Sequence, residues 1–179
     1  MKRVLIPALA VAALAACTTP PIDTPKATGS VTLSELTGLP RETAGPAMVP
    51  AVPAFNINAP EGLAIPVPDN ARQVTLSTAT LHIKLTNRMA IPLQFRLALS
   101  KTDRPYEDAS ASLTPEPLLI AEGESKQIDR PVDPTLFKQP KVYMGVTLST
   151  PGNFPKIVTV RGTDAIDVES WVTVQVKLL

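Results

Sequence analysis

Apolar and polar side chains alternate along residues 91–100, and this pattern constrains the fold more than any other feature of the sequence. Ile91, Leu93, Phe95, Leu97 and Leu99 share one parity, whereas the residues between them are mostly polar or small. A strict period of two is typical of a β-strand with one buried face, and no helical pattern fits this segment. We therefore expect a half-buried strand here.

Shorter alternating runs recur through residues 74–178, and Val and Thr dominate them, as is typical of strands. The parity changes near Ser77, which predicts a β-bulge there. Four short polar turns punctuate the runs at residues 86–88, 122–124, 150–153 and 161–164, and we expect them to be hairpin turns. About seven strands in residues 69–179 predict an all-β, antiparallel, immunoglobulin-like β-sandwich. An antiparallel barrel is the alternative.

Proline is unusually frequent in this chain, with 20 prolines against 8 glycines, and half of the prolines lie within residues 17–68. Because proline lacks a backbone donor and restricts its predecessor, we expect residues 17–68 to form an extended, proline-rich tether. Residues 29–36 are compatible with a strand or a single helical turn, and residues 54–58 with a strand. The sequence leaves open whether residues 30–36 and 54–58 join the sandwich.

Residues 1–16 have the pattern of an export signal. Lys2 and Arg3 form a positive start, an apolar run follows, and small residues precede Cys17. The apolar run is shorter than the ~20 residues that a membrane-spanning helix needs. We therefore expect cleavage of the signal rather than a transmembrane anchor.

Residues Leu14, Ala15, Ala16 and Cys17 resemble the lipobox of bacterial lipoproteins. The resemblance implies that the signal is cut before Cys17, whose thiol carries a diacylglycerol and whose new amine is usually acylated, often with palmitate. Two or more acyl chains hold a protein at a bilayer stably. In that family an Asp after the cysteine commonly retains the protein at the inner membrane. Thr18 follows here, which favours the outer membrane where the source has two membranes.

A second resemblance covers residues 74–148. The segments 81–87, 91–93, 120–125 and 142–146 are similar to bacterial immunoglobulin-like modules and to water-stress (WHy) domains. Both groups are β-sandwiches in which an Asn ends one strand and a polar, Gly-containing turn precedes another. The resemblance implies the fold and nothing more specific, because such modules serve many functions.

The chain lacks the residues that several kinds of functional site require. It has 1 histidine, 1 cysteine and a formal net charge of +1, so the histidine-rich metal sites, disulfide frameworks and basic patches of nucleic-acid-binding proteins are not expected. No glycine-rich phosphate loop or nucleophile motif occurs. His82 is expected on the solvent face of a strand. We expect no enzyme activity, no cofactor, and no nucleotide or nucleic-acid partner.

Two weaker signals concern binding. Trp171 is expected to be partly buried at the start of an edge strand, or else to be an anchor that faces a partner, since tryptophan is enriched at interface hot spots. Asp164, Asp167 and Glu169 fall in a predicted loop. Calcium takes its oxygen ligands from such loops, but solvated turn residues are the simpler interpretation.

The sequence therefore predicts a non-enzymatic, lipid-anchored protein of the cell envelope. Its sandwich would serve as a scaffold or accessory subunit that binds an envelope protein or a surface-layer assembly. The alternative is a carrier module that holds a metal ion or a small apolar ligand. The sequence does not identify the partner or ligand, the oligomeric state, or the face of the membrane.

Overall fold

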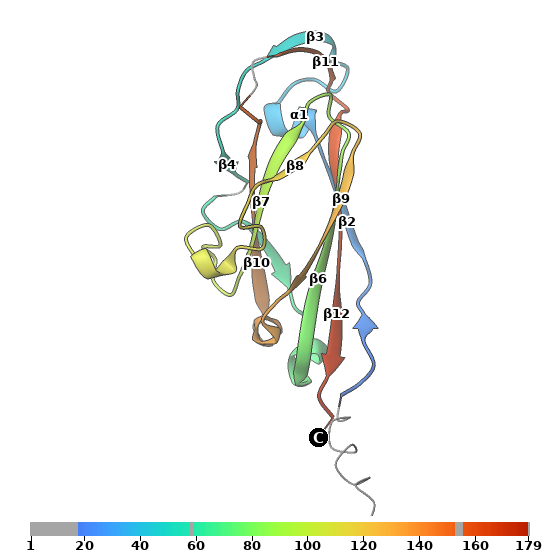
Figure 1. Cartoon of the computed structure of the whole chain (residues 1–179), viewed down its shortest axis with the longest axis vertical. Coiled ribbons are helices and arrows are strands. Elements are labelled where there is room, and N and C mark those ends of the chain that lie inside the picture. Colours follow the sequence, from blue (N-terminus) through green and yellow to red (C-terminus); the bar gives the residue numbers. More distant parts are fainter. Residues whose placement is uncertain (1–17, 58, 153–155, 179) are drawn as a thin grey trace, which may run out of the picture.

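The structure is a computed structural model, and it describes residues 18–57, 59–152 and 156–178. Two antiparallel β-sheets pack face to face in an elongated body, and a separate two-stranded ribbon lies at one end (Figure 1). The predicted all-β, antiparallel sandwich is confirmed. Seven strands, β6 to β12, occur in the described part of residues 69–179, as expected.

Sheet I has the order β1/β2, β12, β6, β9, and β1 and β2 follow one another along the same edge of β12. Its strands are β1 (Ile22–Asp23), β2 (Ala27–Thr32), β6 (Leu76–Asn87), β9 (Ser125–Pro131) and β12 (Ala165–Val176). The register between β6 and β12 shifts so that Ser77 has no partner on β12. The bulge predicted near Ser77 is thus confirmed.

Sheet II has the order β4/β5, β10, β7, β8. Its strands are β4 (Phe55–Asn56), β5 (Leu63–Pro66), β7 (Leu93–Ser100), β8 (Leu118–Ile120) and β10 (Lys141–Ser149). The ribbon, called the distal ribbon below, pairs β3 (Ala44–Val49) with β11 (Lys156–Arg161). The short helices are α1 (Leu33–Thr37), α2 (Asp69–Gln73), η2 (Ala109–Ala111) and η3 (Pro134–Lys138). No described helix has the length and apolar character that crossing a membrane requires.

The core lies between the inner faces of the two sheets. Ile83 and Leu85 of β6 and the odd-numbered residues of β7 are buried, and Phe95 and Ile120 are almost completely so. Their neighbours along the strands point outward. The period-two pattern therefore identified the inward face correctly.

The four short turns are not hairpins, contrary to the prediction. They join β6 to β7, β8 to β9, β10 to β11 and β11 to β12, and none of these consecutive strands pair with each other among the described residues. Each turn instead carries the chain from one sheet, or the distal ribbon, to another. The pairs β6–β9 and β7–β10 interlock between the sheets as in immunoglobulin-like sandwiches. Strand β12 takes the place beside β6 where such domains have their first strand.

Outside helix α1, the described part of residues 18–68 is mostly extended, as expected, but it does not form a tether that stands apart from the sandwich. Strands β1 and β2 pair with β12, β4 and β5 pair with β10, and β3 pairs with β11. Residues 30–36 and 54–57 thus join the fold. Proline is tolerated in edge strands, where Pro46 and Pro66 lie, and β2 contains none. The beginning of this segment lies at the end of the body opposite the distal ribbon, called the proximal end, where Thr18 pairs with Lys177 (Figure 1).

Candidate functional site

The three carboxylates proposed as a metal site lie apart and have other partners. Asp167 and Glu169 belong to β12 rather than to a loop, and they form ion pairs with Arg88 (2.8 Å) and Lys26 (2.5 Å). Asp164 accepts a hydrogen bond from the backbone N–H of Arg161 within its turn. Among the described residues, no three metal-ligating side chains come close enough to hold an ion. The structure therefore does not support the calcium site.

Trp171 lies in the middle of β12, which is an inner strand of sheet I because β1 and β2 cover its free edge. Its ring is half-buried and stacks on the His82 imidazole, with 4.8 Å between the ring centroids, and the Lys26 ammonium lies 4.4 Å from the Trp171 ring centroid. The predicted partial burial is confirmed, but the edge-strand position is wrong. Trp171 thus packs against His82 and Lys26, and its role as a partner-facing anchor stays a prediction. Residues 1–17, including Cys17 and the signal-cleavage residues Leu14, Ala15 and Ala16, lie outside the described residues.

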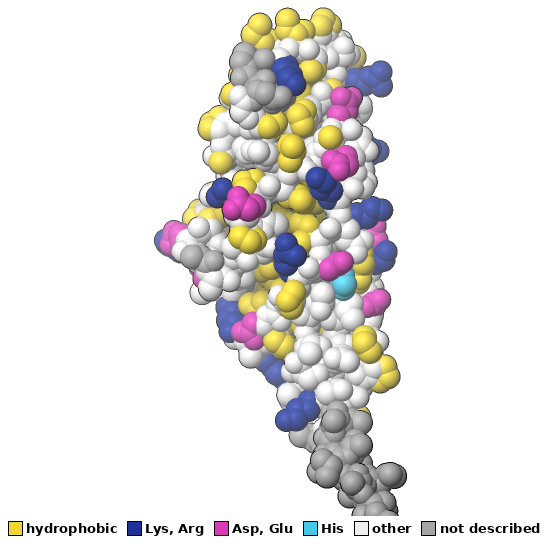
Figure 2. All heavy atoms as spheres, viewed as in Figure 1, with side chains coloured by type: hydrophobic (Ala, Val, Ile, Leu, Met, Phe, Trp, Pro, Cys, Tyr) yellow, Lys and Arg dark blue, Asp and Glu magenta, His cyan; other side chains and the backbone are white. Residues whose placement is uncertain are grey.

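The most exposed large hydrophobic side chains in the described part of the chain meet on the distal ribbon. Met48 of β3 and Ile157 of β11 are register partners, and 68% and 71% of their surfaces are exposed. Met48 is also among the residues that line the pocket described next. Figure 2 shows hydrophobic side chains gathered along this tip of the molecule. Exposed apolar side chains at paired positions of neighbouring strands are typical of a surface that a partner covers.

An apolar pocket of about 430 Å³ lies between the distal ribbon and the end of the sandwich. The ribbon contributes one wall, and α1 and the turn after β6 contribute the others. The main lining side chains are Leu33, Leu36, Leu39, Ala47, Val49, Val52, Met89, Ile91, Leu148 and Val160. These are aliphatic or thioether side chains. The lining thus favours an apolar occupant over a charged one.

Helix α1 is held against this pocket by its own capping groups. The Thr32 hydroxyl accepts from the Glu35 backbone N–H, and the Glu35 carboxylate accepts from the Thr32 N–H at 2.8 Å, which forms a capping box. This backbone hydrogen bond lowers the pKa of Glu35. Gly38 ends the helix in the left-handed conformation. As a result Leu33 and Leu36 pack against the core side of the pocket.

The polar side chains on the pocket wall already have partners within the chain. Thr37 donates to the Leu33 carbonyl at 2.7 Å, and the Thr150 hydroxyl accepts from the Val52 N–H at 2.7 Å. Asp164 and Ser149 are likewise hydrogen-bonded. Each of these polar side chains is therefore already hydrogen-bonded within the chain when an occupant enters the pocket. Burial of apolar surface would supply its affinity.

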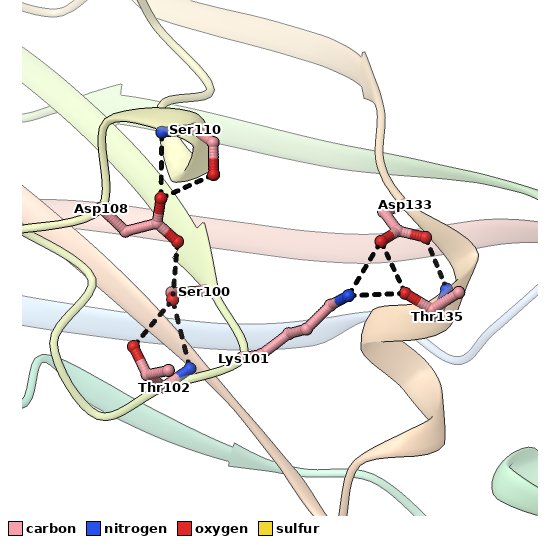
Figure 3. A network of polar contacts seen from close by, with 7 residues as sticks. All are labelled: Ser100, Lys101, Thr102, Asp108, Ser110, Asp133 and Thr135. Carbon is pink, nitrogen blue, oxygen red and sulfur yellow. Dashed lines mark hydrogen bonds and ion pairs between the residues drawn. The ribbon is translucent and has the colours of Figure 1, made fainter.

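A network of polar contacts lies near η2 and η3 (Figure 3). Asp108 accepts from the N–H and hydroxyl of Ser110, and Asp133 accepts from Thr135 in the same way. Hydrogen bonds from Thr135, with Lys101 at 3.0 Å, lower the pKa of Asp133 to about 2. Each aspartate thus caps the short helix that follows it. The network is a structural device, since its acceptors are engaged within the fold.

Sequence analysis did not find the distal pocket. The pattern Thr32-Leu-Ser-Glu35 matches a capping box and is a signal that could have located α1. The pocket itself joins residues 33–52 to residues 89–93 and 148–164, and no local pattern connects these segments.

No protein-family model matches the chain, and no curated protein matches it significantly. Similar solved structures include the coat protein of tobacco streak virus, at 14% identity and a TM-score of 0.37 over 78% of this chain and 88% of that one. Infectious bursal disease virus, Gx strain, aligns at 7% identity with a TM-score of 0.31 over 87% of this chain and 37% of the viral one. Similarities this distant carry no inference about the activity of this chain.

Proposed function

We propose that the chain is a non-enzymatic, lipid-anchored protein of the bacterial cell envelope that binds an envelope protein through its distal end. The observation that carries this proposal is the pair of exposed side chains Met48 and Ile157 above an open apolar pocket. An apolar side chain of the partner would fill the pocket, and the exposed pair would pack around it. Interfaces of this kind concentrate their affinity in a few desolvated anchors.

The geometry of the chain suits an anchor at Cys17. Thr18, the next residue, pairs with Lys177 at the proximal end, while the distal ribbon lies at the opposite end of the long axis (Figure 1). A bilayer at Cys17 would therefore leave the pocket facing away from the membrane. This arrangement would present the distal surface to an envelope partner.

The test compares matched surface variants of the full, membrane-extracted protein. Met48→Ser combined with Ile157→Ser removes the exposed pair, whereas Leu119→Ser removes a hydrophobic side chain that is 44% exposed on β8, in sheet II. After crosslinking in cells, the wild type and the Leu119→Ser variant should recover the same partner in a fixed ratio, and the double variant should lose it. Recovery of that partner by the double variant, with an unchanged melting temperature, would refute the proposal.

A second candidate function is carriage of a small aliphatic ligand in the same pocket. The fully partnered polar groups on its wall favour this alternative, because they leave the cavity without hydrogen-bonding preferences. A saturating fatty acid such as dodecanoic acid should then raise the melting temperature, since ligand at 100 times its Kd stabilises by about 2.7 kcal/mol. Ala47→Leu, which fills the pocket, should abolish that shift. No shift in the wild type would exclude this candidate.

A further inference from the structure

One hydrogen-bonded row crosses the whole width of sheet I on its outer face. It takes one residue from each of four adjacent strands: Asp129 of β9, His82 of β6, Thr173 of β12 and Asp23 of β1. His82 Nδ1 lies 2.6 Å from Asp129 Oδ1, and His82 Nε2 lies 2.8 Å from Thr173 Oγ1. Thr173 Oγ1 in turn lies 2.5 Å from Asp23 Oδ1. The row thus begins and ends at a carboxylate.

The number of protons that this row has available for its hydrogen bonds depends on the charge of His82. Three hydrogen bonds require three protons, because an ionised carboxylate only accepts. The Thr173 hydroxyl supplies one, so the imidazole must supply the other two. A neutral imidazole carries one N–H, and one of the three contacts would then bring two acceptors together. All three hydrogen bonds form only when both ring nitrogens of His82 are protonated.

His82 has one direct partner of opposite charge, Asp129, and it reaches the second carboxylate, Asp23, only through the Thr173 hydroxyl. Its side chain is 17% exposed, and the stacked Trp171 ring covers one of its faces. Asp129 also accepts from Gln127, and this hydrogen bond, with that from His82, lowers the pKa of Asp129. The other charged groups around the row are Lys26 and Glu169, which pair with each other, Lys84 on β6 and Arg130 on β9.

Strand β1 depends on this row more than the other strands do. It has only two residues in register with β12, whereas β6 and β9 pair along seven residues and β12 and β6 along eleven. Beside it, the Thr24 backbone N–H donates to the Val172 carbonyl at 2.9 Å. Asp23 is the side chain that joins β1 to the row. Loss of one bond from the row would therefore loosen β1 first.

We propose that this row is a proton-dependent clasp that holds β1 on sheet I when His82 is doubly protonated and loosens it when His82 is neutral. Histidine is the side chain suited to such a change, because its charge varies between pH 5 and 8. If residues 18–24 leave β12, the chain gains an extended span of up to about 25 Å at the proximal end. The clasp itself does not depend on the proposed function. Only one consequence rests on it, namely that the released span would increase the distance between the sandwich and a membrane.

Amide hydrogen exchange and NMR of the imidazole nitrogens test the clasp directly. The chain has 1 histidine, His82, so the imidazole nitrogen signals report its protonation without overlap from other histidines. The protection factor of the Thr24 amide should fall about three- to ten-fold as His82 loses its proton, as expected for one hydrogen bond net of solvation. The Leu33 amide, bonded to the Asp164 carbonyl in the distal half, should show no such step and serves as the internal reference.

Two variants of Thr173 separate the clasp from general effects of pH. Thr173→Val removes the hydroxyl and should abolish the step at Thr24 while His82 still titrates, whereas Thr173→Ser keeps the hydroxyl and should retain the step. His82→Gln should make Thr24 protection independent of pH. A wild-type Thr24 amide that does not follow the titration of His82, or a Thr173→Val variant that still does, would overturn the proposal.

Discussion

Replacing Asn87 should destabilise the protein more than replacing any exposed asparagine. The side chain is completely buried at the turn between β6 and β7. Its Nδ2 donates to the carbonyls of Ile91 (2.7 Å) and Ile120 (3.1 Å), and its Oδ1 accepts from the Met89 N–H at 2.9 Å. One amide therefore joins the turn that leaves sheet I to the strand β8 of sheet II.

The expected magnitude follows from the groups that lose their partner. Asn87→Ala leaves the Met89 N–H and the Ile91 carbonyl without the hydrogen-bond partner that this side chain provides. Each unsatisfied buried group costs about 1–3 kcal/mol. Because carbonyls tolerate this better than N–H groups, we expect a total loss of about 3 kcal/mol. For a chain of this size, that lowers the melting temperature by about 6–12 °C. Asn70→Ala, at an exposed position in α2, is the matched control and should change stability by less than about 0.5 kcal/mol.

Asn87→Asp gives the reasoning a sharper test. The new carboxyl would face the carbonyls of Ile91, Ile120 and Ala121. Burial and these acceptors should raise its pKa in the folded state. The variant should therefore be less stable than Asn87→Ala at pH 7 and should recover stability as the pH falls, when the protonated acid can donate. Urea unfolding at pH 7 and pH 5 measures both. A loss below about 1 kcal/mol for Asn87→Ala, which is less than one unsatisfied group should cost, or a variant Asn87→Asp with no recovery at pH 5, would refute the argument.

Three further predictions concern other parts of the chain. The lowered pKa of Asp133, about 2 against 3.8, means that its carboxylate stabilises the fold above pH 4 and that this contribution is lost as the pH falls toward 2. Asp133→Asn should reduce the pH dependence of the free energy of unfolding in that window, by less than about 1 kcal/mol because the side chain is half exposed. The control variant Asp103→Asn, at an exposed position, should leave this pH dependence unchanged. Gly162→Ala should cost about 1–3 kcal/mol, since its Cβ would lie 2.4 Å from the Pro40 carbonyl oxygen; Gly29→Ala, with nothing within 4 Å, is the control for thermal unfolding. Cys17→Ser should move the protein from the membrane to the soluble fraction, and continued sedimentation with membranes would contradict the lipid anchor.

The strands were predictable because burial on one face imposes a period of two on the sequence. The pairing of strands was not, because a short polar turn is compatible with both a hairpin and a crossing between sheets. At residues 86–88 the crossing is favoured by Asn87, whose side chain hydrogen-bonds the Met89 N–H within the turn and the distant Ile120 carbonyl of β8. The proline-rich segment was mispredicted as a free tether because prolines exclude central strands but not edge strands. The edges of β10, β11 and β12 were available for it.

The candidate site was harder to predict than the fold. Asp167 and Glu169 lie two residues apart on a strand, and their cationic partners Arg88 and Lys26 lie just outside strands β6 and β2. Spacing along the chain alone therefore suggested a loop site that does not form. The outward orientation of His82 was predicted from parity and is confirmed. Its partners Asp129 and Thr173 were beyond reach, because they lie 47 and 91 positions away in the chain.

The position of β12 bears on how the molecule reaches its final form. Residues 18–32 and residues 76–87 lie on opposite edges of this one strand, which ends at Val176. Residues 18–32 therefore have no edge of sheet I to pair with until residues 165–176 have been synthesised. Until then this segment stays unpaired. Assembly of sheet I is then a late event, governed by closure of a loop that spans most of the polypeptide.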